Sequence, residues 1–208
     1  VLRSGVAIDM PAGPSEVAVL ADDTCVPEFV AADLLAQAEH GPDSQVLLFS
    51  DSEKVIDETL VEVDRQLETL TRKDTAAIAL KNSSAVVVES LDQAMEILND
   101  YAPEHLIIAT ADAEKRADSV VNAGSVFIGN YSCESAGDYA SGTNHTLPTG
   151  GAARAYSGVS VASFTKTITY QSLTETGIRE LGPTIETLAN AEGLDAHRKA
   201  VTIRLDAI

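Results

Sequence analysis

The residues QVLLFS at positions 45–50 place four large apolar side chains in succession, which is typical of a strand buried on both faces of a sheet. Similar apolar runs recur along the chain, and helical patterns lie between them. The predicted strands are Glu16–Ala21, Gln45–Ser50, Ser84–Glu89, His105–Thr110 and Val126–Gly129, and the predicted helices are Pro27–Glu39, Ser52–Leu70, Thr75–Leu80, Leu91–Tyr101 and Ala113–Asn122. This alternation predicts an α/β fold, with a mostly parallel sheet flanked by helices on both faces.

Both ends of the chain depart from this alternation. One further strand is predicted at Gly5–Met10, and Val159–Tyr170 alternates like an exposed or antiparallel strand. The expected elements after it are a helix over Thr174–Glu192 broken at Gly182 and Pro183, a short helix at Asp195–Lys199 and a last strand at Ala200–Leu205. We therefore expect an α/β domain over residues 1–155 and a C-terminal α+β segment over residues 156–208. That segment is too small to hold a core alone and must pack on something.

The composition excludes several classes of function. The chain has 208 residues and a formal charge of −18, from 32 acidic and 14 basic side chains. Nucleic-acid backbones and anionic membranes are excluded as partners, because both need clustered Lys and Arg. No apolar run approaches the ~20 residues of a membrane helix, and no signal peptide is visible. The first residue is Val, and we expect a longer parent chain that is cut on its N-terminal side.

The two cysteines, Cys25 and Cys133, form no disulfide framework, so a reducing, cytoplasmic location is expected. Cys133 lies beside a glycine-rich segment, where a catalytic thiol is one interpretation. A small buried side chain is the favoured one, because free cysteine usually packs as a small apolar residue.

The segment ESAGDYASGTNHTLPTGG at positions 134–151 is rich in glycine and has almost no apolar bulk. Glycine is used where the backbone turns with positive φ or approaches another group closely. Long segments without periodicity are either disordered or functional, and the low charge of this one favours an ordered functional loop. Because sites in parallel α/β sheets form at the carboxyl ends of the strands, we expect the loop and the strands starting at Glu16 and His105 to border a site.

Gln37 and His40 close a predicted helix, and their spacing places both side chains on one face. They can therefore reach one ion, through an amide oxygen and a ring nitrogen. The alternative is a C-terminal cap, in which a cationic His stabilises the helix end, and the pair by itself favours the cap.

Glu104 and His105 follow a proline at the start of a predicted strand, where two adjacent ionisable groups suit acid–base catalysis. A surface turn is an equally good interpretation of the pair. Asp138, in the same loop as His145, suits either a metal ligand or a turn former. His197 by itself is expected to be solvent-exposed.

Taken together, the Gln, Asp and two His side chains offer nitrogen and oxygen donors and no sulfur. That donor set suits zinc with an open catalytic position better than a structural zinc site, which is usually rich in cysteine.

Five runs of this sequence resemble the histidinol dehydrogenase family. They are DMPAGPSE at 9–16, LLAQAEHGPDSQ at 34–45, YAPEHLII at 101–108, AGSVFIG at 123–129 and ESAGDYASGTNHTLPT at 134–149. The resemblance extends from the first residue to about Leu205, and ESAGDYASGTNH is its most specific part. LPTGGAARAYSG, at 147–158, departs from the bulkier or more polar residues of relatives, which leaves the packing of that loop open.

The resemblance implies a zinc enzyme of histidine biosynthesis that oxidises L-histidinol to L-histidinal and then to L-histidine, and reduces two NAD in turn. It also implies a homodimer in which each active site borrows residues from the partner's C-terminal segment. By matching motifs, the implied zinc ligands are Gln37, His40, Asp138 and His197, the last supplied by the other chain. Glu104 would activate water for the second oxidation, and His105 would be the general base. The implied substrate contacts are Ser15, His145 and Glu192, together with His105 and the zinc ligands.

The family's N-terminal half, which includes much of the dinucleotide-binding region, has no counterpart in this sequence, and no G-x-G-x-x-G follows a strand. We therefore expect an incomplete Rossmann-like domain that does not oxidise L-histidinol alone. Two alternatives stay open at this point. One is a zinc hydrolase in which Glu104 activates water, and the other is an inert fragment that folds and dimerises.

Overall fold

The computed structural model describes Ile8, Met10 and residues 13–208, so most of the strand predicted at Gly5–Met10 lies outside the described residues. The chain divides into two compact units, Val1–Phe164 and Thr165–Ile208. This division follows Phe164, whereas the boundary predicted from the sequence follows Ala155.

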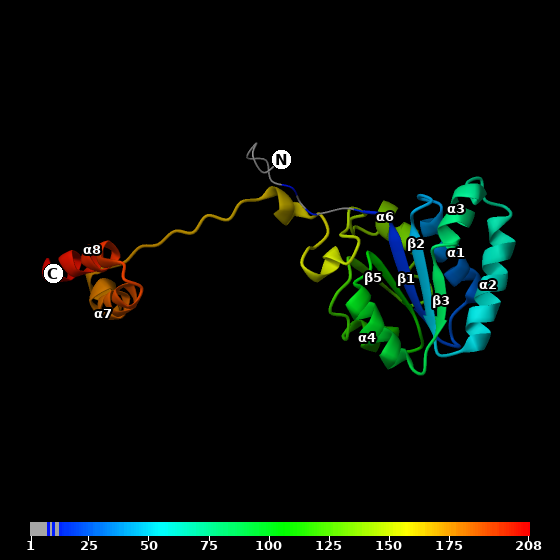
Figure 1. Cartoon of the computed structure of the whole chain (residues 1–208), viewed down its shortest axis with the longest axis horizontal. Helices are drawn as coiled ribbons and strands as arrows, with labels where there is room; N and C mark the ends of the chain where they lie inside the picture. Colours follow the sequence, from blue (N-terminus) through cyan, green and yellow to red (C-terminus); the bar gives the residue numbers. More distant parts are fainter. Residues whose placement is uncertain (1–7, 9, 11–12) are drawn as a thin grey trace. The chain divides into compact units, whose positions relative to one another are not determined.

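A five-stranded parallel sheet forms the centre of the first unit, in the order β3-β2-β1-β4-β5 (Figure 1). The strands are β1 (Glu16–Ala21), β2 (Gln45–Ser50), β3 (Ser84–Val87), β4 (His105–Ala109) and β5 (Ser125–Ile128). β1 lies in the middle, where Val17 is opposite Val46 of β2 on one side and His105 of β4 on the other. The predicted parallel α/β fold is therefore confirmed.

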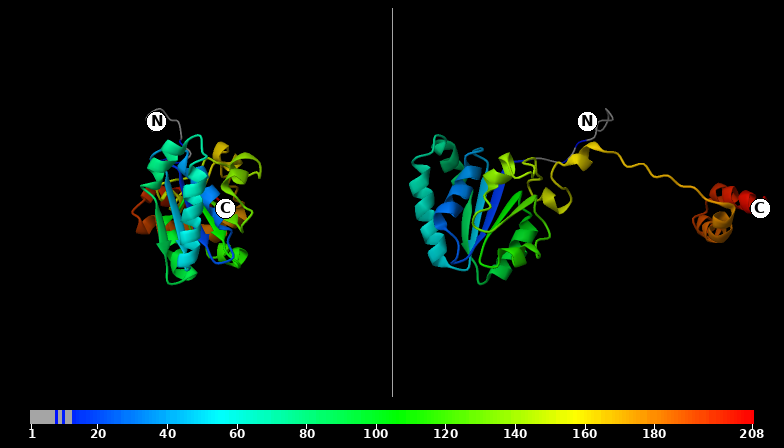
Figure 2. Two further views of the ribbon diagram at one scale, coloured as in Figure 1. Left: turned by 90° about the vertical axis from the view of Figure 1, so that its right-hand side faces the viewer. Right: turned by 180° about the vertical axis from the view of Figure 1, so that it is seen from behind.

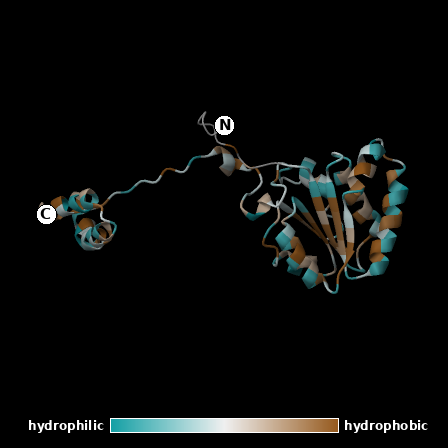
Figure 3. Ribbon diagram, in the orientation of Figure 1, coloured by the Kyte–Doolittle hydropathy of each residue, from teal (hydrophilic) through white to brown (hydrophobic). Residues whose placement is uncertain are grey.

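Helices cover both faces of this sheet, as the sequence predicts (Figures 1 and 2). The helices on one face are α1 (Pro27–Ala38), α2 (Glu53–Leu67) and α3 (Lys73–Leu80), and those on the other are α4 (Leu91–Tyr101) and α5 (Ala113–Ala117). Alternate residues of β1 divide between two cores, because successive side chains of a strand point to opposite faces. Val17 and Val19 pack with α1–α3, whereas Ala18 and Leu20 pack with α4 and α5. In Figure 3, hydrophobic residues (brown) lie along the strands, and hydrophilic residues (teal) cover much of the helices.

The passage from α4 into β4 fixes where two predicted site residues lie. Ser90 caps the start of α4 by accepting a hydrogen bond from the Gln93 N–H at 3.2 Å. Ala102 ends the helix with a left-handed backbone, φ 58°, and Pro103 cannot continue it. The chain therefore enters β4 directly, with the residue after Pro103 just before the strand and His105 as its first residue.

The glycine-rich segment is ordered but is not a loop throughout. It begins with the short helix α6 (Glu134–Tyr139), and the turn η2 (Ala152–Arg154) follows its end. The strand predicted at Val159–Tyr170 is wrong. Within the described structure these residues contain only the turn η3 (Val161–Phe164) and pair with no strand, which leaves their backbone groups without a sheet partner.

The second unit consists, over its described residues, of two helices packed against each other, α7 (Glu175–Ala191) and α8 (Asp195–Asp206). The strand predicted at Ala200–Leu205 is wrong, because these residues continue α8. The break predicted at Gly182 and Pro183 is also wrong, since α7 runs through both. Gly182 lets Leu205 of α8 approach closely, because a Cβ at that position would lie 2.8 Å from a Leu205 methyl carbon. The unit is thus helical rather than α+β.

In the part of the chain that the structure describes, no helix is both long enough and apolar enough to span a membrane.

Candidate metal and acid–base site

Polar side chains from three regions of the first unit gather at the amino ends of β1 and β4. Gln37 and His40 lie at the end of α1, Glu104 and His105 at the start of β4, and Asp138 in α6. A site was expected from the sequence at the opposite, carboxyl ends of the strands, and that expectation is wrong for this cluster. The reason lies in α1, which runs antiparallel to the strands it connects, so its last turn returns to the level where β1 and β4 begin.

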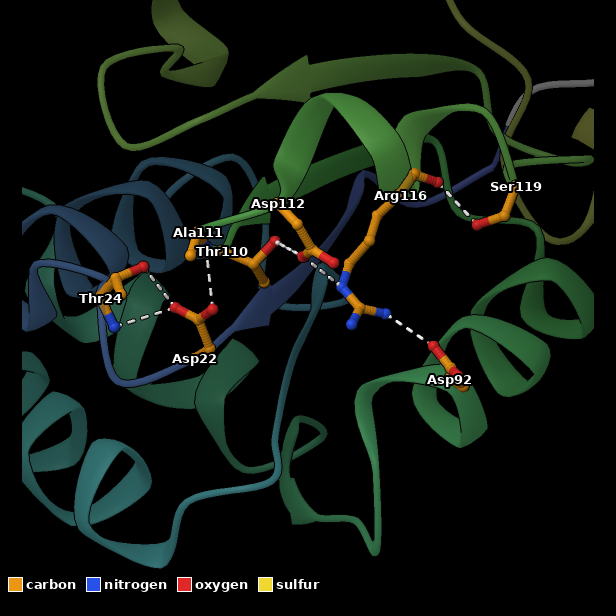
Figure 4. A network of polar contacts seen from close by, with 8 residues as sticks. All are labelled: Asp22, Thr24, Asp92, Thr110, Ala111, Asp112, Arg116 and Ser119. Atoms are coloured by element: carbon orange, nitrogen blue, oxygen red, sulfur yellow. Dashed lines mark hydrogen bonds and ion pairs between the residues drawn. The ribbon is translucent and has the colours of Figure 1, made fainter.

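The carboxyl ends of β1 and β4 are occupied by the chain itself (Figure 4). The carboxylate of Asp22, just after β1, accepts hydrogen bonds from the N–H of Thr24 at 2.9 Å and the N–H of Ala111 at 2.8 Å. Backbone N–H groups at this position hold the phosphates of nucleotides in many α/β proteins. Here a carboxylate uses them, so these residues do not fit an anionic ligand.

Main-chain groups of Glu16, the first residue of β1, hold both members of the Glu104–His105 pair. The Glu16 N–H donates to Oε2 of Glu104 at 2.9 Å, and Nδ1 of His105 lies 3.0 Å from the Glu16 carbonyl oxygen. The side chain of Glu16 accepts a hydrogen bond from the Gly150 N–H at 2.9 Å, which ties the end of the glycine-rich segment to the same strand. The register of β1 against β4 therefore sets the geometry of the pair.

His105 is held as a neutral base. A carbonyl only accepts hydrogen bonds, so its contact with Nδ1 places the ring proton there and leaves the lone pair on Nε2. No described residue donates to Nε2, and Oδ1 of Asp138 lies 3.8 Å from it. Burial lowers the pKa of His105, against the opposing effects of the Glu16 hydrogen bond and the Asp138 charge. A buried neutral imidazole with a free lone pair is suited to accept a proton.

Glu104 is nearly buried, and this burial raises its pKa to about 7. The hydrogen bond from the Glu16 N–H opposes the rise, and the nearby carboxylates of Glu16 and Asp138 add to it. The group therefore changes charge near neutral pH, which suits a carboxylate that takes a proton from water.

Gln37 has no exposed surface, and Glu104 sets the orientation of its amide group. The amide nitrogen donates to Oε2 of Glu104 at 3.3 Å. The other end of the amide, Oε1, is buried and meets no donor among the described residues. A buried oxygen without a partner is unfavourable unless a cation or a water meets it.

His40, Glu134 and Asp138 add further donors. Each offers one nitrogen or oxygen atom, and these atoms lie within 4.8 Å of one another. Glu134 is only 1% exposed. Burial, together with the charges of Asp138, Asp33 and Glu104, raises the pKa of Glu134 to about 9. Because a group of carboxylates repels itself when ionised, a bound cation would stabilise this arrangement.

The donor set fits zinc, since it offers nitrogen and oxygen atoms that include the unpartnered buried oxygen of Gln37. Three of the four predicted ligands, Gln37, His40 and Asp138, lie at this end of the first unit. The fourth, His197, lies in α8 of the second unit, where it is exposed. Its role as a ligand stays a prediction.

The predicted substrate contacts are less tightly grouped. Ser15 precedes β1, is half-buried and lines a cavity of about 390 Å³ together with His40. His145 is exposed in the segment after α6, and Glu192 is exposed at the end of α7 in the second unit. Their roles as substrate contacts stay predictions.

Three acidic residues of this site were not predicted from the sequence: Glu16, Asp33 and Glu134. Asp33 lies on the face of α1 that carries Gln37, and its carboxylate accepts a hydrogen bond from the Glu134 N–H. Spacing could have found two of them, because Asp33 lies four residues before Gln37 and Glu134 four before Asp138. Glu16 acts through its backbone, and no sequence pattern reports such a contact.

Comparisons with known proteins agree on one family. The family model described as histidinol dehydrogenase matches residues 1–205. The chain is 59% identical over 203 residues to the histidinol dehydrogenase of Bacteroides fragilis strain YCH46, covering 98% of this chain and 47% of that protein. It is 56% identical over 204 residues to the Pseudoalteromonas translucida protein of the same name, covering 98% and 47%. It is also similar to the crystal structure of histidinol dehydrogenase from Elizabethkingia anophelis, with a TM-score of 0.96, 57% identity and coverage of 99% of this chain and 48% of that one. The chain spans about half the length of the curated relatives it matches.

Proposed function

The chain belongs to the histidinol dehydrogenase family, and we propose that its amino-end site serves the zinc- and NAD-dependent oxidation of L-histidinol, through L-histidinal, to L-histidine. The observation that supports this activity is the gathering of Gln37, His40 and Asp138 beside the pair Glu104 and His105. Family membership favours a dehydrogenase over a zinc hydrolase that uses the same residues.

Zinc held by Gln37, His40 and Asp138 would supply a positive charge for nitrogen atoms of the substrate's imidazole and amine groups to bind. This binding would fix the position of the alcohol carbon. The residues of this chain handle the protons. In the first oxidation, Nε2 of His105 takes the proton of the substrate hydroxyl, and the carbon that bears this hydroxyl loses a hydride, which NAD would accept. The Glu16 carbonyl keeps the ring in the tautomer that this step requires, and the charge of Asp138 stabilises the protonated ring.

The second oxidation needs a hydrated aldehyde, because the aldehyde carbon carries no hydroxyl group to lose a proton. Glu104 takes a proton from water while the water oxygen bonds to the aldehyde carbon, and the protonated ring of His105 returns its proton to the aldehyde oxygen, which becomes the second hydroxyl of the hydrate. The carbon-bound hydrogen of the hydrate then leaves as hydride, which a second NAD would accept, and one hydroxyl proton goes to His105, which is neutral again. Hydrogen bonds from the Glu16 N–H and from Gln37 hold the Glu104 carboxylate in place for this role.

We infer that NAD does not bind at the end of the sheet where dinucleotides bind in related folds, because Asp22 uses the N–H groups of Thr24 and Ala111 there. We infer that NAD binds to residues outside this chain and that the 208 residues alone do not turn over L-histidinol.

Two residues of the second unit also have a role in this proposal. Glu192 and His197 are both exposed, at the end of α7 and in α8, and so are free to meet another molecule. We infer that in a homodimer they extend the site of the partner chain, where His197 would be the fourth zinc ligand.

Two measurements test the proposal. Zinc titration of the wild-type chain and of Asp138→Ala is expected to show clearly weaker binding by the variant. Equal affinity would remove the proposed metal site. An assay of NAD reduction with L-histidinol is expected to show none for the chain alone, and any turnover would contradict the inference that NAD binds elsewhere.

A further inference from the structure

The first turn of α1 and the middle of α2 form an apolar groove on the surface of the first unit, which we call the α1–α2 groove. Val26 and Pro27, at the start of α1, and Val61 of α2 line a cavity of about 470 Å³ there. Val61 is 66% exposed. Apolar side chains that gather in an open groove, rather than lie scattered singly, mark a surface where another molecule binds.

Four acidic side chains complete the lining of the α1–α2 groove: Glu28, Asp57, Glu58 and Glu62. Two basic side chains, Lys54 and Arg65, form ion pairs with three of them. Among the described residues, no lysine or arginine pairs with Asp57. Glu28 also offsets the partial positive charge at the start of α1. The groove therefore has an excess of negative charge, which suits a basic partner.

The apolar surface continues from the groove to a pair of aromatic rings. Phe29 of α1 and Tyr131, in the loop after β5, have ring centroids 6.0 Å apart and planes inclined by 56°. Tyr131 is 90% exposed. Lysine and arginine side chains bind to the faces of aromatic rings, so this pair favours the same kind of partner as the acids do.

We propose that the α1–α2 groove and the Phe29–Tyr131 pair dock a basic amphipathic segment of a separate protein. Its apolar side chains occupy the groove, and its lysines or arginines lie against the acids and the aromatic rings. A second copy of this chain is opposed electrostatically, because it carries the same net charge of −18. The groove lies at the first turn of α1, whereas Gln37 lies in its last, so this surface is separate from the proposed metal site.

A labelled helical peptide made only of leucine and lysine, with the leucines on one face, tests the proposal by fluorescence anisotropy with the 208-residue chain. The peptide is expected to bind, and to bind more weakly at high salt because the acids of the groove contribute. Val61→Asp is expected to weaken binding about tenfold, since an apolar contact is lost. The added negative charge by itself would attract a basic peptide, so a weaker affinity reports the apolar contact.

Val121→Asp is the matched control. Val121 is 77% exposed between α5 and β5, and the substitution adds the same charge outside the groove. It is expected not to weaken binding. Val61→Ser is a second variant that should weaken binding without a change of charge, and circular dichroism shows whether each variant is folded. Failure of the wild type to bind the peptide, or equal affinities of the two Val61 variants and Val121→Asp, would overturn the proposal.

Two further measurements identify other occupants of the groove. If Val61→Asp, but not Val121→Asp, dissociates a self-associated form in sedimentation equilibrium, the groove contacts a second copy of the chain. If a longer parent protein fails to bind the peptide that the 208-residue chain binds, residues of the parent cover the groove. Either result would exclude a separate protein as the occupant.

Discussion

Nδ1 of His105 lies 3.0 Å from the carbonyl oxygen of Glu16, so the main chain of the neighbouring strand fixes the tautomer of the proposed base. Many catalytic histidines are oriented by a carboxylate instead. A carbonyl orients the ring without a full negative charge, which leaves burial free to lower the pKa of His105. The base is therefore neutral and ready to accept a proton at physiological pH.

His105→Asn is expected to lower kcat for L-histidinol by about 10²–10⁴-fold in the NAD-reducing enzyme, because the variant has no ring nitrogen to accept the hydroxyl proton. Zinc affinity should persist, since His105 is not among the proposed donors. Steady-state kinetics measures the expected fall in kcat, and a zinc titration of the same preparation measures the zinc affinity. A variant with normal kcat would exclude His105 as the base.

Oxidation of added L-histidinal is expected to speed up as pH rises through about 7, because Glu104 must lose its proton before it can take one from water. A cation bound beside Gln37 would shift this midpoint to lower pH, since positive charge favours the carboxylate. Glu104→Gln should abolish this rise and slow the aldehyde step while alcohol deprotonation remains. The comparison requires rates with L-histidinol and L-histidinal over the same pH range, and an unchanged profile in Glu104→Gln would contradict the assignment.

Glu134→Gln is expected to stabilise the metal-free chain at alkaline pH. The pKa of Glu134 is about 9 in the folded chain against an ordinary value of 4.5, so the folded state keeps a proton that the unfolded state releases. The free energy of unfolding of the wild type therefore falls as pH rises from about 4.5 towards 9. Glutamine does not titrate, so the variant should exceed the wild type by an amount on the order of a few kcal/mol near pH 9.

Urea unfolding in the presence of a chelator, at about pH 5 and again near pH 9, measures this difference. Glu104 and Asp33 also titrate above their ordinary pKa values, so the difference between variant and wild type is the informative quantity. An equal pH dependence in the two proteins would show that Glu134 ionises normally.

Gly124→Ala is expected to destabilise the first unit by about 1–3 kcal/mol, the usual range for overpacking. A Cβ at this position would lie 2.5 Å from the Glu104 carbonyl oxygen, which is main chain and cannot turn away. Gly177→Ala in α7 is a contrasting substitution, because its nearest neighbours would lie at 3.4 and 3.6 Å. That change should stabilise α7 by about 0.5–1 kcal/mol, and thermal unfolding of both variants compares them.

The strands and helices of the first unit could be predicted where the spacing of the apolar residues fits only one type of element. The predicted bounds of Glu16–Ala21, Gln45–Ser50 and Leu91–Tyr101 agree with β1, β2 and α4, because buried parallel strands and amphipathic helices leave clear patterns. The second unit was not predictable in this way. Ala200–Leu205 contains β-branched residues that favour a strand, yet packing of Leu205 on Gly182 makes it helical, so tertiary contacts overrode the local preference.

The site residues could also be predicted only in part. Gln37, His40, Glu104, His105 and Asp138 could be selected because their chemistry and spacing are visible in the sequence. Their location at the amino ends could not, since the general rule for α/β sheets points to the other end. The contacts made by the backbone of Glu16 depend on strand register, which the residue pattern does not encode.

Placing the cluster at the amino ends of β1 and β4 also decides the electrostatic polarity of the surrounding main chain. α1 and α4 both end there, so their terminal carbonyl groups give this rim partial negative charge, whereas both helices begin near the opposite rim. The rim at the amino ends of β1 and β4 is thereby suited to positive ions and poorly suited to phosphate. A search for inhibitors of this rim would do better with amines and imidazoles than with nucleotide analogues.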